Sequence, residues 1–218
     1  MKRGASRWIV AGILAVLASP LLAPQLLAFP YHGASHGYEV WSEAPLPQDQ
    51  LYRVTARAAK LVAASPLADP SGERRRVFLT RGGWRWNWLA LQTRDAFALT
   101  RAAGGALLIN ESDLAADKVR NRYGRTRGLS RVIAHETCHG MERRAFGMIK
   151  SDVLTPQWLR EGYCDHVAQE STLSEAEAAQ LKATGSHSPA LVYFEGRKRV
   201  ERELATNGKN VAALFAHY

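Results

Sequence analysis

His135 and His139 stand four residues apart in the stretch Val-Ile-Ala-His-Glu-Thr-Cys-His that begins at Val132. Residues four apart lie nearly above one another on an α-helix, so the two imidazoles share one face only if this segment is helical. Helical spacing of apolar residues continues through residues 130–146, and Gly147 ends the pattern. The segment 130–146 is therefore predicted to be a helix that presents two cation-binding side chains together.

Glu136 lies between the two histidines and completes the pattern His-Glu-x-x-His. Zinc accepts imidazole nitrogens, needs a third protein ligand, and in catalytic sites keeps its fourth position for water. A carboxylate beside the ligands can take a proton from that water and pass it to a leaving amine. The pattern predicts a hydrolytic zinc site in which His135 and His139 are ligands and Glu136 is the general base.

Glu161 is the candidate for the third zinc ligand. It lies in residues 156–169, which Thr155-Pro156 opens as a second helix. The residues between His139 and Glu161 suffice for a turn at Gly147 and an antiparallel return of the chain. The two helices are therefore expected to bring His135, His139 and Glu161 to one cation.

With both segments in view, the chain resembles the gluzincins, the thermolysin-like and aminopeptidase-like zinc metallopeptidases in which a glutamate ligand follows on the next helix. Trp158-Leu159-x-Glu161-Gly162-aromatic is similar to the aminopeptidase form of that second motif. The resemblance implies zinc, hydrolysis of peptide bonds, and His135, His139 and Glu161 as ligands. Asp165 matches the acid that holds a ligand histidine in thermolysin-like enzymes.

Differences from the metzincin and aminopeptidase motifs narrow the class of metallopeptidase that the chain can resemble. Positions 142 and 145 are Glu and Ala, where the metzincin extension requires Gly and His. Arg160 replaces the Asn usual before the aminopeptidase ligand, and no Gly-x-Met-x-Asn substrate loop is present. A metzincin is disfavoured, and the choice between endopeptidase and exopeptidase stays open.

Tyr193, followed by His187, is the candidate donor to the oxyanion, a role that Tyr or His commonly fills in this superfamily.

The remaining periodicity predicts an α+β fold, a small mixed sheet followed by a helical part. Helical spacing marks residues 51–64, 174–183 and 189–204, and apolar runs between glycine-containing breaks mark strands at 77–80, 96–100 and 106–110. Trp84, Trp86 and Trp88 alternate with polar residues. In a strand the three indoles would share one face. That face would either pack in the interior or be exposed for contact with a membrane or a substrate. Residues 105–110 form either the edge strand that binds an extended peptide or an interior strand.

The N-terminus predicts a membrane segment. Lys2, Arg3 and Arg7 precede an uncharged apolar run from Trp8 to Phe29, which is either an uncleaved anchor or a cleaved signal peptide. We divide the chain into this segment at 1–30, a linker at 31–50 containing a first strand at 38–41, and a catalytic domain at 51–218. The positive flank places the folded part outside the cytoplasm, in the periplasm or at the cell surface.

Cys138 and Cys164 are the two cysteines of the chain and fall on the two predicted ligand helices. Because the expected compartment permits disulfides, a bond between them is a testable hypothesis. Such a bond would fix His139 relative to Glu161.

A formal net charge of +9 favours anionic surfaces. No nucleic-acid motif accompanies the arginine groups, so we do not expect nucleic acid as a partner. The expected partners are a peptide or protein substrate and the membrane. The alternative is a non-catalytic metal-binding or peptide-binding surface protein that retains the zinc site. Glu136 separates the two readings, since a site that only binds does not need it.

Overall fold

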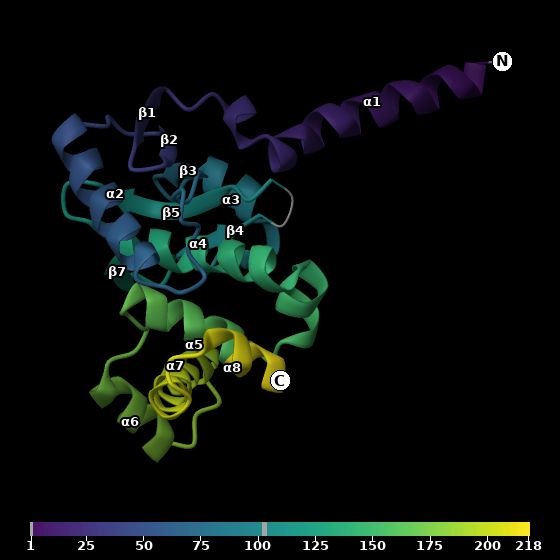
Figure 1. Ribbon diagram of the computed structural model, residues 1–218. Helices are drawn as coiled ribbons and strands as arrows, with labels where there is room; N and C mark the ends of the chain where they lie inside the picture. The colour runs from purple at the N-terminus through teal and green to yellow at the C-terminus, as the bar shows by residue number, and fades with distance from the viewer. Residues whose placement is uncertain (1, 102–103) are drawn as a thin grey trace.

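A computed structural model describes residues 2–101 and 104–218 of the chain. Its N-terminal helix α1 (Lys2–Leu22) projects from a body in which a sheet is covered by helices, and a helical layer follows (Figure 1). The other helices are α2 (Gln48–Ala63), α3 (Trp84–Ala90), α4 (Leu129–Phe146), α5 (Gln157–Ala168), α6 (Glu175–Ala183), α7 (Pro189–Thr206) and α8 (Val211–His217). Short turns of helix are η1 (Pro24–Leu27), η2 (Leu91–Thr93) and η3 (Lys150–Leu154).

Seven strands form one mixed sheet, which confirms the predicted α+β class. They are β1 (Tyr31–Ser35), β2 (Tyr38–Ser42), β3 (Arg75–Thr80), β4 (Ala98–Thr100), β5 (Leu107–Asp113), β6 (Lys118–Arg120) and β7 (Thr126–Gly128). Their order is β1-β2-β3-β5-β6-β7, with β4 paired to β5. The pairs β2–β3 and β3–β5 are parallel and the others are antiparallel.

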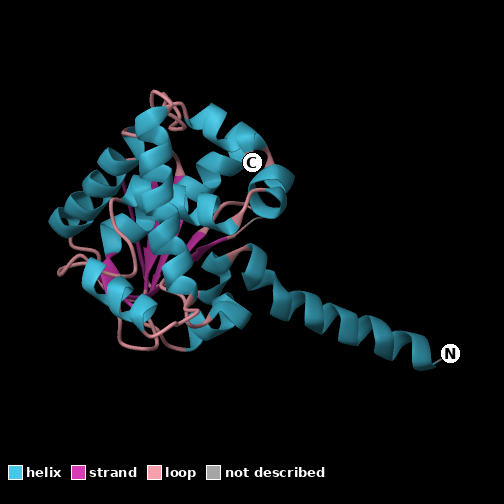
Figure 2. Ribbon diagram, turned by 90° about the horizontal axis from the view of Figure 1, so that it is seen from below, coloured by secondary structure: helices cyan, strands magenta, loops and turns pink. Residues whose placement is uncertain are grey.

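The two faces of the sheet are covered by different helices. Val77 and Leu79 of β3 point to the face where α2 and α4 pack, in a core with Val54 and Ile133. Phe78, between them in the strand, points to the opposite face, where α3 packs. In Figure 2 the strands lie enclosed by helices. Because α4 is buried against the sheet at its beginning and against α5 further on, its position is fixed from both sides.

Most predicted elements form close to their expected bounds, and three regions differ. Residues 31–50, predicted as a linker with a strand at 38–41, form the hairpin β1–β2 and the start of α2, and the predicted strand is β2. Of residues 105–110, those from Leu107 onward belong to β5, which lies between β3 and β4 and is therefore interior, so the edge-strand alternative for this segment is wrong. In the described part of the chain β4 pairs only with β5, so β4 supplies the edge.

The tryptophan-rich segment is a helix, so the face that Trp84, Trp86 and Trp88 would share in a strand does not form. Trp84, Trp86 and Trp88 all lie in α3, where residues two apart do not share a face. Trp86 is buried and donates from Nε1 to the carbonyl of Arg94, while Trp84 and Trp88 are exposed. Alternating aromatic residues suit a strand, but the packing of Trp86 and Leu89 on Phe78 stabilises a short helix.

Helices α5 and α7 approach closely where Gly162 meets Gly196. A Cβ atom on Gly162 would clash with the backbone carbonyl of Gly196, and one on Gly196 would clash with the carbonyl oxygen of Trp158. The absence of both side chains lets the two backbones touch, which places α5 between α4 and α7.

Within the described residues, no helix combines the length and the apolarity needed to cross a membrane.

Candidate metal centre

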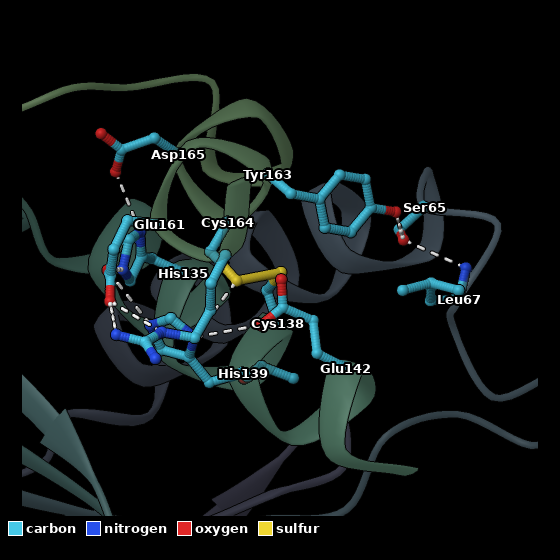
Figure 3. The surroundings of a disulfide bond; sticks show 12 residues. Ser65, Leu67, His135, Cys138, His139, Glu142, Glu161, Tyr163, Cys164 and Asp165 are labelled. Atoms are coloured by element: carbon cyan, nitrogen blue, oxygen red, sulfur yellow. Dashed lines mark hydrogen bonds and ion pairs between the residues drawn. A yellow bond between two sulfur atoms is a disulfide. The ribbon is translucent and has the colours of Figure 1, made fainter. Parts of the chain in front are cut away.

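Helices α4 and α5 bring the three predicted ligands together. Nε2 of His135 lies 3.4 Å from Oε2 of Glu161, and Nε2 of His139 lies 3.5 Å from the same oxygen. Figure 3 shows the two imidazoles of α4 facing the carboxylate of α5. One donor atom from each of the three residues lies within 4.8 Å of the donor atoms of the other two. The predicted group His135, His139 and Glu161 is thus assembled by the fold.

The spacing of these donors fits a tetrahedral metal ion. With metal–ligand bonds of about 2.0–2.1 Å, two ligands of a tetrahedron lie about 3.4 Å apart. The distances of 3.4 and 3.5 Å from Glu161 to the two histidines agree with that value. Two imidazoles and one carboxylate are also a ligand set that zinc accepts in catalytic sites. The residues present therefore fit a zinc ion.

Asp165 lies next to Nδ1 of His135, on the side away from Glu161, where an acid that orients this ligand is expected. Its Oδ1 lies 2.9 Å from Nδ1 of His135 and accepts a hydrogen bond of 3.1 Å from Nη2 of Arg127. Asp165 is fully buried, and Arg127 in turn pairs with Glu170 at 3.1 Å. With Nδ1 turned toward the carboxylate, Nε2 of His135 is the nitrogen that faces the ligand group.

Glu142 lies in the same way next to Nδ1 of His139, a contact that was not predicted from the sequence. Its Oε2 lies 3.3 Å from Nδ1 of His139, three residues earlier on the same helix. Glu142 is fully buried, and burial raises the pKa of its carboxyl. The spacing of His139 and Glu142 in the sequence could have indicated this contact, because residues three apart on a helix are neighbours. Both histidines therefore have a buried carboxylate behind Nδ1 and leave Nε2 toward the ligand group.

The charges of the group are strongly coupled. Burial by itself lowers the pKa of both histidines, but the carboxylates around them outweigh it: the pKa of His135 rises to about 9 and that of His139 rises well above its usual value. Burial by itself raises the pKa of Glu161, and the two histidines outweigh it, so that this pKa lies well below its usual range. In this arrangement a bound cation and protons compete for the same nitrogens.

Arg160 steadies the other oxygen of Glu161. Its Nε and Nη2 each lie 3.3 Å from Oε1, and its Nη1 donates to the carbonyl of Asp152 at 2.9 Å. Oε1 therefore accepts hydrogen bonds from Arg160, and Oε2 is the oxygen that faces the two histidines. The departure from the aminopeptidase pattern at position 160 thus supplies a positioning contact of its own.

The disulfide hypothesis is confirmed in the structure. Cys138 and Cys164 are bonded, with a Cα–Cα distance of 5.4 Å, and join α4 to α5 (Figure 3). Cys138 precedes His139, and Cys164 lies between Glu161 and Asp165 in sequence. Sγ of Cys164 is 3.5 Å from Nδ1 of His139. The crosslink therefore lies directly behind the ligand group.

A cleft of about 520 Å³ contains the group, Glu136 and Tyr193. One wall is the edge strand β4, and the other includes the start of α7 with Tyr193. Burial raises the pKa of Tyr193, so its hydroxyl keeps its proton as a donor. His187, the second candidate for that role, is exposed and is not among the described residues that line the cleft.

Glu136 is buried in the wall of the cleft, and its carboxylate contacts β4. Oγ1 of Thr100 donates toward Oε2 of Glu136 at 2.6 Å and lies 2.9 Å from its backbone oxygen. The carboxylate does not belong to the group of converging donors. Glu136 thus lies next to the ligands in sequence, faces the same cleft, and leaves the three-ligand set intact.

Comparison with family models, with curated proteins and with solved structures found no match for this chain.

Proposed function

We propose that the protein is a zinc-dependent peptidase, as the likeness of its motifs to the gluzincins implies. One observation carries the proposal: Oε2 of Glu161 lies at the spacing of a tetrahedral metal from Nε2 of His135 and from Nε2 of His139, inside a cleft that also holds a carboxylate outside the ligand set. That carboxylate, Glu136, is the group that hydrolysis needs and that metal binding alone does not.

Each residue then has a chemical role. A zinc ion held by His135, His139 and Glu161 would polarise a peptide carbonyl and lower the pKa of a water molecule to about 7. Glu136 takes the proton of the attacking water and delivers it to the leaving amine. Tyr193 donates its hydroxyl proton toward the negative charge that develops on the carbonyl oxygen.

An extended peptide is the substrate that the walls of the cleft support. In the described part of the chain β4 pairs only with β5, and its three residues line the cleft. A peptide can add to such a strand through backbone hydrogen bonds, whatever its side chains. Apolar residues of the wall, such as Phe97 and Leu99, would contact those side chains.

We place the protein outside the cytoplasm. The Cys138–Cys164 disulfide supports an oxidising compartment, where such bonds persist. The basic N-terminus and the apolar run after it support export, with residues 1–30 acting as a membrane tether or, if they are cleaved, as a signal for secretion.

The test combines metal analysis with cleavage of a peptide library by wild type and Glu136→Gln. We expect one zinc per chain in both proteins, and cleavage that falls about 100-fold or more in the variant. Glu175→Gln, on the exposed surface of α6, is the matched control and should cleave like wild type. Zinc bound by every protein with cleavage by none would reject the enzyme and leave a metal-binding protein.

A further inference from the structure

Thr100 connects the edge strand of the cleft to Glu136. It is the last residue of β4, and its hydroxyl lies 2.6 Å from Oε2 and 2.9 Å from the backbone oxygen of Glu136. A threonine hydroxyl has one proton, so it can donate to one of these oxygens at a time. In the described part of the chain, no other side chain forms a hydrogen bond or an ion pair with this carboxylate.

This contact matters because a glutamate side chain is otherwise free to turn. A buried glutamate has three side-chain torsions, and a general base acts only within hydrogen-bond reach of its proton. The open position of a catalytic metal is also a place where a mobile neighbouring carboxylate could bind. The hydroxyl of Thr100 holds the carboxylate of Glu136 against the wall formed by β4, next to the ligand group and outside it.

We propose that Thr100 is a positioning residue for the general base, an inference that rests on the peptidase function above. Its hydroxyl fixes the carboxylate of Glu136 toward the site of the attacking water. Because Thr100 belongs to a strand that lines the cleft and that, in the described part of the chain, pairs on one edge only, the same residue also sets the base in register with a peptide bound along β4. The base and the substrate backbone are thereby aligned by one strand.

Thr100→Val and Thr100→Ser separate this role from packing. Valine keeps the shape and removes the hydroxyl, whereas serine keeps the hydroxyl. We expect kcat to fall about 10-fold in Thr100→Val, since one hydrogen bond to a charged group is lost, with KM within about twofold of wild type. Thr100→Ser should recover most of the activity, and all three proteins should bind one zinc. Equal kcat in wild type and Thr100→Val, or an equal loss in both variants, would contradict the proposal.

A binding measurement tests the same idea without turnover. A peptide hydroxamate, titrated calorimetrically into the zinc-loaded protein, presents a zinc-chelating group beside Glu136. Thr100→Val should weaken its binding about fivefold in the wild-type background and leave it unchanged in the Glu136→Ala background, where no side-chain acceptor remains for the hydroxyl. An equal loss in both backgrounds would mean that Thr100 does not act through Glu136.

The two failures remain distinguishable. If wild type binds zinc and the hydroxamate but cleaves no peptide, the peptidase function is wrong, and the calorimetric comparison still decides the role of Thr100. If Thr100→Val does not fold, Thr100→Ala takes its place in the same comparison with Thr100→Ser.

Discussion

Cys138 and Cys164 are joined by a disulfide that links the helix carrying His139 to the helix carrying Glu161. A crosslink between helices that already pack together restricts the unfolded chain and limits relative movement of the ligands. Under non-reducing conditions we expect the unfolded protein to contain no free thiol, and after reduction two. Titration with a thiol reagent in denaturant measures this. Two free thiols in the oxidised protein would reject the bond.

Removing the crosslink should weaken both the fold and the metal site. In the double variant Cys138→Ser/Cys164→Ser we expect the free energy of unfolding to fall by about 2–4 kcal/mol. The zinc dissociation constant should rise, because α4 and α5 are then held by packing alone. Denaturant melts of the metal-free protein and competition with a chelator measure the two effects separately. Unchanged zinc affinity would mean that packing alone fixes the ligands.

Asp165→Asn should lower zinc affinity by about 10- to 100-fold, the usual effect of losing a carboxylate behind a ligand histidine. The amide keeps the shape of Asp165 but removes the charge that faces Nδ1 of His135 at 2.9 Å. Chelator competition measures the change, with Glu175→Gln as the surface control. An Asp165→Asn protein that binds zinc like that control would show that the contact does not orient the ligand.

Gly162→Ala should destabilise the protein by about 3 kcal/mol, because its Cβ would strike the backbone of Gly196 and force α5 and α7 apart. Gly83→Ala is a suitable control, since nothing lies within 4 Å of a Cβ added there. Thermal unfolding of both variants measures the difference. Equal melting temperatures would mean that the helices separate without cost.

Stability should fall at alkaline pH because of two buried tyrosines. Burial raises the pKa of Tyr38 and of Tyr163 from 10.0 to about 12. An acid whose pKa is higher in the folded state holds its proton more tightly there, so its stabilising effect is complete below pH 10 and is lost as the pH rises toward 12. The loss is at most about 1.4 kcal/mol per pH unit for each tyrosine.

Denaturant melts across this pH range test the expectation. Tyr163→Phe removes one of the two titrating groups, together with the hydrogen bond to Ser65. The variant should be less stable at neutral pH and should lose stability with a shallower slope above pH 10. Identical slopes in the two proteins would contradict the assignment to Tyr163.

The parts of the fold that the sequence predicts are those set by local signals. The predicted helix at 174–183 begins at Ser174 with a capping box that the structure contains, and the helix at 130–146 ends at Gly147. The short strands β6 and β7 have no comparable signal. Each has three residues, of which one is buried; β6 pairs with β5, and β7 pairs with β6.

The candidate site likewise contains residues that local sequence signals predict and residues that they do not. The ligands His135, His139 and Glu161 follow from spacing within two helices, so their convergence could be predicted. Thr100 could not, because its contact with Glu136 joins residues 36 positions apart and depends on β4 lying at the edge of the sheet. Nothing near Thr100 in the sequence indicates that neighbour.

The contact between Gly162 and Gly196 has a further consequence for the cleft. Gly162 follows Glu161, and Gly196 lies about one turn beyond Tyr193 on α7. The separation between the acidic ligand and the tyrosine on the opposite wall is therefore set by two main chains in direct touch rather than by side chains between them. Substitutions in the apolar interior can accumulate, and change volume and shape there, while this span stays the same.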